Sequence, residues 1–150
     1  MNKLTKLVAV SGTAIVMLAA CGEKEETNTF KGEQSGVDIT TKLTHKGDKV
    51  TEQKTESVLN YKDYGVEKEQ VKELLDKESE KYQNIDGLEE KVKYTDDKAI
   101  ESIKVDMEKV DKEKLKKIES SAFTNADKDK DVSYKKTKKA LEKAGFKEEK

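Results

Sequence analysis

The chain has 150 residues, of which 42% are charged and 33% apolar, so its composition supports one domain of ordinary size with a lean core. The net charge is −1, and without a clustered basic excess we expect no binding to nucleic acid. All 31 basic residues are lysine, which argues against tight carboxylate or phosphate clamps, because these sites favour the planar guanidinium group of arginine.

Residues 1–20 have the three regions of a secretory signal peptide. Lys3 and Lys6 precede an apolar run, Leu7–Leu18, and two small residues follow it. A helix that crosses the hydrocarbon core needs roughly 20 apolar residues, so this run is too short to span a membrane, but it fits the apolar region of a signal peptide. We therefore expect residues 1–20 to be removed.

The signal peptide ends in a lipobox. Leu18, Ala19 and Ala20 form the predicted recognition sequence for the signal peptidase, and the thiol of Cys21 would receive the diacylglyceryl group. Cys21 is the only cysteine, so no internal disulfide competes for it. Two acyl chains hold a protein stably on a bilayer. The sequence thus predicts a lipid-anchored protein on the extracytoplasmic face of the cell membrane; the alternative is an ordinary secretory signal.

The mature chain is expected in two parts. Residues 21–29 comprise the lipidated cysteine and a polar stretch without periodicity, which we interpret as a flexible tether. Residues 30–150 are predicted to form a single domain.

A first hairpin is predicted at the start of this domain. Apolar and polar residues alternate from Val37 to His45, the period of a half-buried strand, and Lys46–Lys49 is a plausible tight turn. The second strand, Val50–Leu59, has no apolar stripe on either face. We interpret it as an edge or surface strand whose charges discourage aggregation. The alternative is a polar, uncharged strand face that lines a groove.

The pattern then changes to steps of three and four residues, which predicts an amphipathic helix over Val66–Tyr82. The stripe that packs on the sheet would consist of Val71, Leu74, Leu75, Glu78 and Tyr82. Two further strands are expected, at 88–94 and 99–107, with a turn at 95–98 between them.

Helix signals mark the C-terminal part. Asp111 is a good N-cap for a short helix that carries Leu115 and Ile118, and residues 120–131 form a polar loop. Ser133 would cap a final helix, which ends at Gly145 with Phe146 folded back over its last turn. Antiparallel hairpins combined with helices predict an α+β fold, in which an antiparallel sheet built from hairpins carries its helices on one face.

Catalytic and metal-binding motifs are scarce. His45 is the only histidine, which is too few for a hydrolase triad or a zinc site, and we interpret it as a packing residue beside the turn. The alternating acids of Asp127–Asp131 imitate the start of an EF-hand loop, but Val132 and Lys138 stand where the glycine and the bidentate glutamate belong. We expect no catalytic residue, no metal and no cofactor.

Tyrosine supplies most of the aromatic content. The five tyrosines combine an apolar ring with a polar hydroxyl, which suits both lean cores and recognition surfaces. Tyr61 and Tyr64 lie in the connection between strand and helix, and they are the candidates for a surface that contacts a ligand or a partner.

Several segments resemble a known family. They are TFKGE from Thr29, THKGDKVTEQKTE from Thr44, YKDYGVEKEQVKELL from Tyr61, YTDDKAIESIKVD from Tyr94, and KALEKAGFKE near the end. Together they resemble the YehR-like small bacterial lipoproteins, a family of unknown function. The resemblance implies a single α+β domain behind a lipobox and assigns no catalytic residues.

Three functions are compatible with these features. We favour a non-catalytic binding or interaction module in the cell envelope, a monomer whose partner is an unidentified envelope protein or small ligand. An envelope enzyme that uses only Asp, Glu, Lys or Tyr is the second; a cleft holding two carboxylates in different environments would support it. In the third, the end of the leader, AIVMLAA, is released as a peptide signal.

Overall fold

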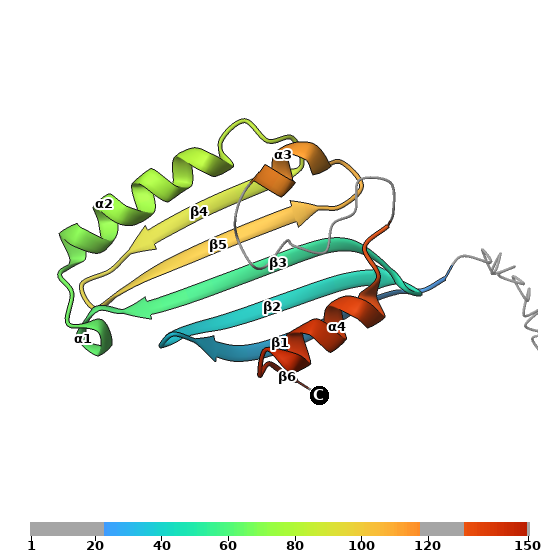
Figure 1. Cartoon of the computed structure of the whole chain (residues 1–150), viewed down its shortest axis with the longest axis horizontal. Coiled ribbons are helices and arrows are strands. Elements are labelled where there is room, and N and C mark those ends of the chain that lie inside the picture. The colour runs from blue at the N-terminus through green and yellow to red at the C-terminus, as the bar shows by residue number, and fades with distance from the viewer. Residues whose placement is uncertain (1–22, 118–130, 150) are drawn as a thin grey trace, which may run out of the picture.

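A computed structural model describes residues 23–117 and 131–149. Six antiparallel strands form one sheet in the order β4-β5-β3-β2-β1-β6 (Figure 1). The strands are β1 (Glu25–Gln34), β2 (Val37–Lys46), β3 (Lys49–Asn60), β4 (Leu88–Tyr94), β5 (Lys98–Asp106) and β6 (Lys147–Glu148). Neighbours in sequence thus pair as hairpins in both halves of the sheet, and β3 joins the two halves by pairing with β5.

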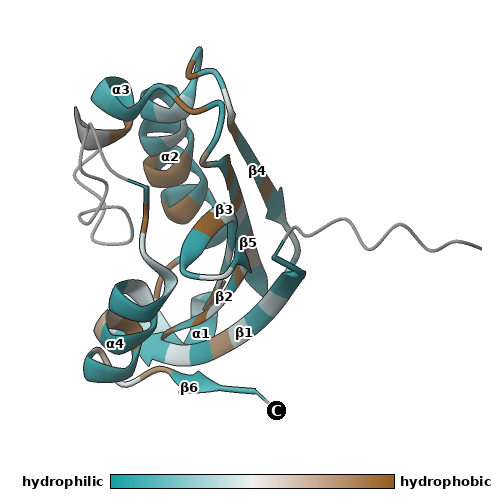
Figure 2. Cartoon of the chain, turned by 90° about the vertical axis from the view of Figure 1, so that its right-hand side faces the viewer, coloured by the Kyte–Doolittle hydropathy of each residue, from teal (hydrophilic) through white to brown (hydrophobic). Residues whose placement is uncertain are grey.

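The helices gather on one face of this sheet. They are α1 (Tyr61–Tyr64), α2 (Lys68–Ser79), the 3-10 turn η1 (Glu80–Tyr82), α3 (Lys112–Lys117) and α4 (Tyr134–Lys143). Figure 2 shows α2, α3 and α4 on the same side, while the opposite face has no helix in the part of the chain that the structure describes. The predicted α+β class is confirmed. In the described ranges, no helix is long and apolar enough to cross a bilayer.

Short turns set the register of the hairpins. Ser35 and Gly36 join β1 to β2, both at positive φ (51° and 79°), and Gly47 in the β2–β3 turn also has a positive φ of 55°. Turns of this kind match the twist of paired strands. The predicted turn at Lys46–Lys49 is therefore confirmed, as is the turn before β5, where Thr95 donates its backbone N–H to the carbonyl of Lys98.

The position of β3 corrects the interpretation of the Val50–Leu59 segment. This strand is not at an edge; it lies between β2 and β5. Its uncharged face is turned toward the core, where Thr51, Gln53 and Thr55 are buried. The prediction of an edge strand was wrong because the neighbour on its second side, β5, comes from a distant part of the chain.

The first strand corrects the boundary of the tether. The spacer was expected to extend through residue 29, but β1 begins at Glu25 and pairs with β2 over its whole length. The domain therefore begins five residues earlier than the expected residue 30. Phe30, at the centre of β1, is fully buried.

Helix α2 is confirmed within the predicted range, although it begins at Lys68. Its N-terminus carries a capping box formed by Glu67 and Gln70. The predicted stripe is wrong at Leu74, whose side chain is 61% exposed. The buried line instead follows Val71 and Leu75, because these residues lie one turn apart on the same face of the helix.

Two apolar clusters lie between the helices and the sheet. The larger surrounds Phe30, Leu43 and Val50 and extends below α3 and α4. The smaller consists of Tyr61, Val71 and Ala99, with Leu59, Val66, Leu75 and Tyr94 packed against it. The core is therefore dense at one end of the sheet and thin at the end where α1 and α2 begin.

The predicted caps at the C-terminal helices are confirmed. The side chain of Asp111 accepts hydrogen bonds from the backbone N–H groups of Glu113 and Lys114. Ser133 accepts one from the backbone N–H of Lys136. Phe146 is buried against the core, and its backbone N–H bonds back to the carbonyl of Leu141.

Several predictions lie outside the described residues. They concern the signal peptide 1–20, the lipobox residues Leu18, Ala19 and Ala20, the lipidated Cys21, Ile118, and most of the polar loop 120–131 with the EF-hand-like acids. Of that loop, the described residue Asp131 pairs with Lys49, its carboxylate oxygen 3.4 Å from the lysine Nζ.

Candidate functional site

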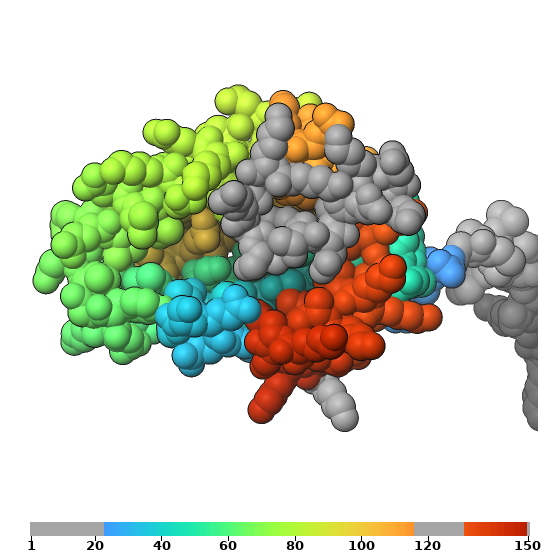
Figure 3. All heavy atoms as spheres, in the orientation of Figure 1, coloured from blue at the N-terminus to red at the C-terminus, as the bar shows by residue number. Residues whose placement is uncertain are grey.

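A groove opens on the helix-covered face, beside the thin end of the core. Its volume is about 340 Å³. Its lining comes from β1 and its turn (Gln34, Ser35), from β2 (Val37, Ile39), from β3 (Ser57, Leu59), from α2 (Leu75) and from β5 (Ala99, Glu101). In the space-filling view, strands of the sheet are visible at the bottom of a hollow between α2, in green, and the β1–β2 turn, in light blue (Figure 3).

The walls of this groove are mostly apolar, which is the usual character of a small-molecule site. Five of the nine lining residues are Val37, Ile39, Leu59, Leu75 and Ala99. Below them lies the Tyr61 cluster, to which Leu59, Leu75 and Ala99 also belong. The groove is therefore a place where the apolar core reaches the surface.

Glu101 is the one ionisable residue among the described residues that line the groove. It is half-buried in the middle of the sheet, between Ser57 on β3 and Val92 on β4 in the strand register. Burial raises the pKa of its carboxyl to about 7, and the nearby carboxylates Glu90 and Glu78 contribute to the increase. Near neutral pH, Glu101 therefore exists in both protonation states.

No described cation compensates this carboxyl. The ion pairs of the described residues do not include Glu101 or its neighbour Glu90. Glu90 instead accepts a hydrogen bond from the hydroxyl of Ser79, over 2.7 Å. In a chain so rich in lysine, an acidic pair without a lysine partner is a distinctive feature of this face.

Polar contacts hold the α2 wall of the groove in place. The hydroxyl of Tyr94 on β4 donates to the carboxylate of Asp76 on α2, over 2.9 Å. Burial and this carboxylate raise the pKa of Tyr94, so it stays a neutral donor. The ammonium of Lys72 pairs with Asp76 and lies 5.6 Å from the centre of the Tyr94 ring. These contacts link α2, which carries Leu75 of the groove lining, to the sheet.

The structure separates the two tyrosines that the sequence grouped together. Tyr61 is 5% exposed and belongs to the core below the groove, with its hydroxyl donating to the carbonyl of Thr95. Tyr64 is 37% exposed and lies against the β1–β2 turn, where a Cβ on Gly36 would lie 3.0 Å from its hydroxyl oxygen. That turn also carries Ser35 of the groove lining, so Tyr64 stands near the groove's rim.

Sequence reasoning missed Glu101, although a signal was present. The inward positions of β5 are Ala99, Glu101, Ile103 and Val105, and three of these four are apolar. A glutamate on the same strand face as core residues loses part of its hydration when the chain folds, which lowers the stability of the folded state. Such a residue marks a candidate functional site.

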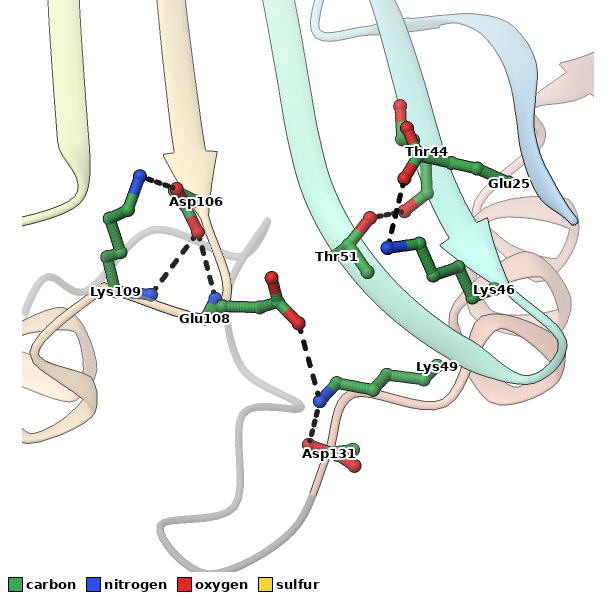
Figure 4. Close-up of polar contacts among 9 residues, drawn as sticks. All are labelled: Glu25, Thr44, Lys46, Lys49, Thr51, Asp106, Glu108, Lys109 and Asp131. Carbon is green, nitrogen blue, oxygen red and sulfur yellow. Dashed lines mark hydrogen bonds and ion pairs between the residues drawn. The ribbon is translucent and has the colours of Figure 1, made fainter. Parts of the chain in front are cut away.

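A second hollow, at the opposite end of the sheet, has a different character. It encloses about 270 Å³ and is lined by Glu25, Thr27, Thr44, Lys46, Thr51, Glu52, Asp106 and Glu108. Figure 4 shows the pairing of Glu25, Asp106 and Glu108, and Glu52 pairs with Lys104 at 3.0 Å. Lys46 contacts Glu25 at 3.4 Å, and Lys49 bridges Glu108 at 3.7 Å and Asp131 at 3.4 Å. Each of these solvent-exposed ion pairs contributes little to the stability of the fold, but its two charges neutralise each other.

The helix-free face of the sheet carries a third hollow, of about 290 Å³. Lys42 and Lys54 face each other there in the strand register, and Lys31 pairs with Glu149 at 2.7 Å. Its lysines are interleaved with Glu56 and threonines, so the surface has no single sign of charge. We therefore regard the apolar groove as the candidate site.

His45 has the packing role that its position in the strand predicted. The side chain is 5% exposed, and its ring is stacked on Tyr134 with ring centres 3.7 Å apart. Its Nδ1 donates to the carbonyl of Gly47 over 2.8 Å, and Nε2 lies 2.9 Å from the side-chain oxygen of Asn28. Within ranges 23–117 and 131–149, no group of three or more His, Cys, Asp and Glu side chains is arranged to hold a metal ion.

Comparison with known proteins defines the class. Residues 26–147 match the family described as a protein of unknown function (DUF1307), and the chain belongs to this family. It is 48% identical to the uncharacterized lipoprotein Lin0239 of Listeria innocua, over 89% of this chain and 87% of that protein. It is 38% identical to the uncharacterized lipoprotein YehR of Escherichia coli K12, over 98% and 96%. The resemblance to the YehR-like lipoproteins is thus confirmed.

Solved structures agree with the fold. The NMR structure of E. coli YehR matches with a TM-score of 0.71 at 36% identity, covering 84% of this chain and 91% of that one. An NMR structure of a protein from Streptococcus pneumoniae TIGR4 matches with a TM-score of 0.56 at 16% identity, which shows the fold alone. Since its relatives are named lipoproteins, lipid anchoring to a membrane is implied for this chain, with a role that is uncharacterised in those relatives.

Proposed function

We propose that this protein is a non-catalytic binding module on the extracytoplasmic face of the cell membrane. The signal peptidase would recognise Leu18, Ala19 and Ala20 and cleave before Cys21, whose acyl chains hold the domain on the bilayer. The observation that carries the proposal is the apolar groove with one half-buried carboxyl, which combines mostly apolar walls with a single ionisable group.

The short tether supports a defined placement of the groove. Strand β1 begins at Glu25, so Cys21 lies within about 14 Å of it even if the intervening chain is extended. The ten residues of β1 then run about 30 Å to Gln34, which lines the groove. The end of the sheet with the β2–β3 turn, called the hairpin end below, would therefore lie next to the bilayer. The groove would open at the opposite end, far from the bilayer and toward soluble ligands.

An envelope enzyme is the second candidate, because Glu101 and Glu90 form the kind of carboxylate pair that acid–base catalysis uses. Glu101 would be the proton donor and acceptor. However, Glu90 does not line the groove, and the remaining polar lining residues in the described ranges are Gln34, Ser35 and Ser57. Because the described lining holds no second ionisable group to share the proton transfers with Glu101, binding is the better-supported function.

The anchor is tested by metabolic labelling with a clickable palmitate analogue. The wild-type protein should incorporate the label and sediment with membranes. Cys21→Ser should do neither, whereas the neighbouring substitution Gly22→Ser should behave as wild type. A Cys21→Ser protein that still carries the acyl label would disprove the assignment of the lipid to Cys21.

The binding role is tested on the whole mature chain without its lipid, by an NMR screen of small ligands. Compounds that bind should shift the amide signals of Ile39 and Ala99 in the groove. Ser57→Phe would fill the groove and should abolish these shifts. Ser102→Phe places the same ring on the other face of the sheet and should leave them unchanged. Shifts that survive Ser57→Phe would place the ligand elsewhere.

A further inference from the structure

We propose that the groove binds a small organic cation, with a primary ammonium group at Glu101 and a short apolar body against Val37, Ile39 and Leu59. This inference rests on the proposed function, because it assigns a ligand class to the same groove.

The charge of the groove supports a cation. Glu101 is the only ionisable side chain in its described lining, and Glu90, which has no described ion pair, adds negative charge next to it, whereas Glu78 is paired with Lys81 at 2.7 Å. Lysine supplies 31 residues of the chain, yet none is part of this described lining. The potential inside the groove is therefore negative, and an anionic ligand would have to approach uncompensated carboxylates.

The groups around Glu101 suit an ammonium more than a bulkier cation. An ammonium has three N–H donors and no acceptor. Ser57 lies directly opposite Glu101 in the β3–β5 register and also lines the groove, so its hydroxyl oxygen is an acceptor next to the carboxyl. A carboxylate and a neutral hydroxyl can accept from one ammonium, while the apolar walls contact the rest of the ligand.

The size of the groove limits the apolar part of the ligand. Small-molecule sites generally enclose about 300–1,000 Å³, and this groove, at about 340 Å³, lies at the lower end. Leu75 closes one side from α2 and Ile39 lies on the β2 side. A short alkyl chain or a single ring fits this space, whereas a long acyl chain does not.

Ligand binding should be linked to proton release. Two acids act on Glu101: Glu90 from β4, which also shares a hydrogen bond with it, and Glu78 from α2, which is itself paired with Lys81. Strand β3 presents the uncharged Ser57 and Leu59. At a pH below about 7 the carboxyl of Glu101 is mostly protonated, and a cation must displace that proton. Affinity for a cation should therefore increase with pH and level off above 8.

The test uses three probes of similar shape, hexylammonium, hexanol and hexanoate, titrated into the mature chain and followed by the amide signals of Ser57 and Ala99. We expect hexylammonium to bind at least tenfold more tightly than the other two at pH 8, and several-fold more weakly at pH 6. Glu101→Gln keeps the shape of the side chain and should reduce its affinity at least tenfold. Glu89→Gln removes a carboxylate on the other face of β4 and is the matched control.

Three results would overturn the proposal. Equal affinity of hexylammonium for Glu101→Gln and wild type would exclude an ion pair at Glu101. Tighter binding of hexanol or hexanoate would keep the groove as a binding site but reject a cationic ligand. If none of the three probes shifts the groove signals, while Ser57→Phe also leaves the response to the wider ligand screen unchanged, the proposed function itself fails.

Discussion

Acidic residues at the two ends of the sheet have opposite surroundings, and their pKa values shift in opposite directions. At the end with the β2–β3 hairpin, Asp106 pairs with Lys109 at 3.0 Å and accepts hydrogen bonds from two backbone N–H groups, and these contacts lower the pKa of its carboxyl. At the groove end, Glu101 is surrounded by apolar groups and other acids, and its pKa is raised to about 7. The acid at the first end is stabilised by a cation and by backbone N–H groups, whereas Glu101 has no described cation, and its hydrogen bond with Glu90 joins it to another acid.

This difference indicates where stability and function reside. Paired charges and the larger apolar cluster hold the hairpin end together, which is the end near the proposed anchor. The groove end has the smaller cluster and retains an uncompensated carboxyl. Proteins commonly keep side chains that lower the stability of the fold, such as this carboxyl, at binding sites. Matched substitutions at the two ends should therefore have different effects on stability and binding.

The largest effect is expected from core truncation at the hairpin end. Leu43 is fully buried, so Leu43→Ala should lower the free energy of unfolding by about 2–5 kcal/mol. Leu59 lines the groove and is only partly buried, so Leu59→Ala should cost about 1–2 kcal/mol. Urea unfolding measures both. Equal losses would show that the groove end carries as much of the stability as the hairpin end.

The second prediction concerns Glu101→Gln and its dependence on pH. Below pH 4.5 the carboxyl is neutral in both the folded and unfolded chains. Between pH 4.5 and about 7 the unfolded chain loses this proton first, so the free energy of unfolding of the wild type falls and stays lower above pH 7. Allowing for partial exposure, Glu101→Gln should therefore stabilise the protein by about 1–2 kcal/mol at pH 8, and by little at pH 4.

The control for this prediction is Glu89→Gln, on the solvent face of the same hairpin. Thermal unfolding at pH 4, 6 and 8 should show a stabilisation that grows with pH for Glu101→Gln and remains flat for Glu89→Gln. A Glu101→Gln variant that is less stable than wild type at pH 8 would mean that the carboxylate has a compensating partner.

Asp48, at the hairpin end, should change the pH dependence of stability in the opposite direction to Glu101. Its carboxylate accepts hydrogen bonds from the backbone N–H of Lys135 and the hydroxyl of Ser133, both at 2.8 Å, so it joins the β2–β3 turn to the start of α4. The backbone bond to Lys135, followed by the bond from Ser133, lowers the pKa of this carboxyl. Its contribution to stability is therefore present at neutral pH and is lost as the pH falls through the lowered pKa, below 3.8.

Asp48→Ala should consequently lower the melting temperature at pH 7, and the difference from wild type should shrink below pH 4. Glu108→Ala, which removes a long and solvated contact to Lys49, should change the melting temperature much less. A constant difference across the whole pH range would show that the charge of Asp48 is unimportant.

Much of the fold could be predicted from local patterns in the sequence. The caps at Asp111 and Ser133 and the turn at Gly47 depend on residues that are close in sequence, so their chemistry was visible there. The central position of β3 depends on its pairing with β5, which begins 38 positions after the end of β3 (Asn60 pairs with Lys98). The alternating Thr and Gln face of β3 fits an exposed strand equally well. Strand β1 was missed because Phe30 is its single buried residue.

The candidate site was less accessible to sequence reasoning. Tyr61 and Tyr64 are close in sequence, but α1 ends in a left-handed residue, Gly65, and the two rings have separate surroundings. The groove gathers residues from β1, β2, β3, α2 and β5, and no local pattern specifies such a set. Only Glu101, an acid at an inward strand position, carried a signal in the sequence.

The smallest effect on stability is expected at the rim of the groove. Tyr64 and Leu74 are the two large apolar side chains that are exposed among the described residues, at 37% and 61%. Replacing either with alanine should change the free energy of unfolding by less than about 0.5 kcal/mol, since neither belongs to a core cluster.

Their effects on binding should differ. Tyr64 lies over the β1–β2 turn beside the groove, so Tyr64→Ala should weaken hexylammonium binding by about threefold, which corresponds to about 0.6 kcal/mol. Leu74 is one residue away from Leu75 of the groove wall, but its side chain points to solvent, and Leu74→Ala should leave the affinity unchanged. Equal affinities for both variants would restrict the site to the groove itself and remove Tyr64 from it. A loss with Leu74→Ala alone would instead move the ligand to the outer face of α2, where the uncompensated carboxyl of Glu101 could not attract it.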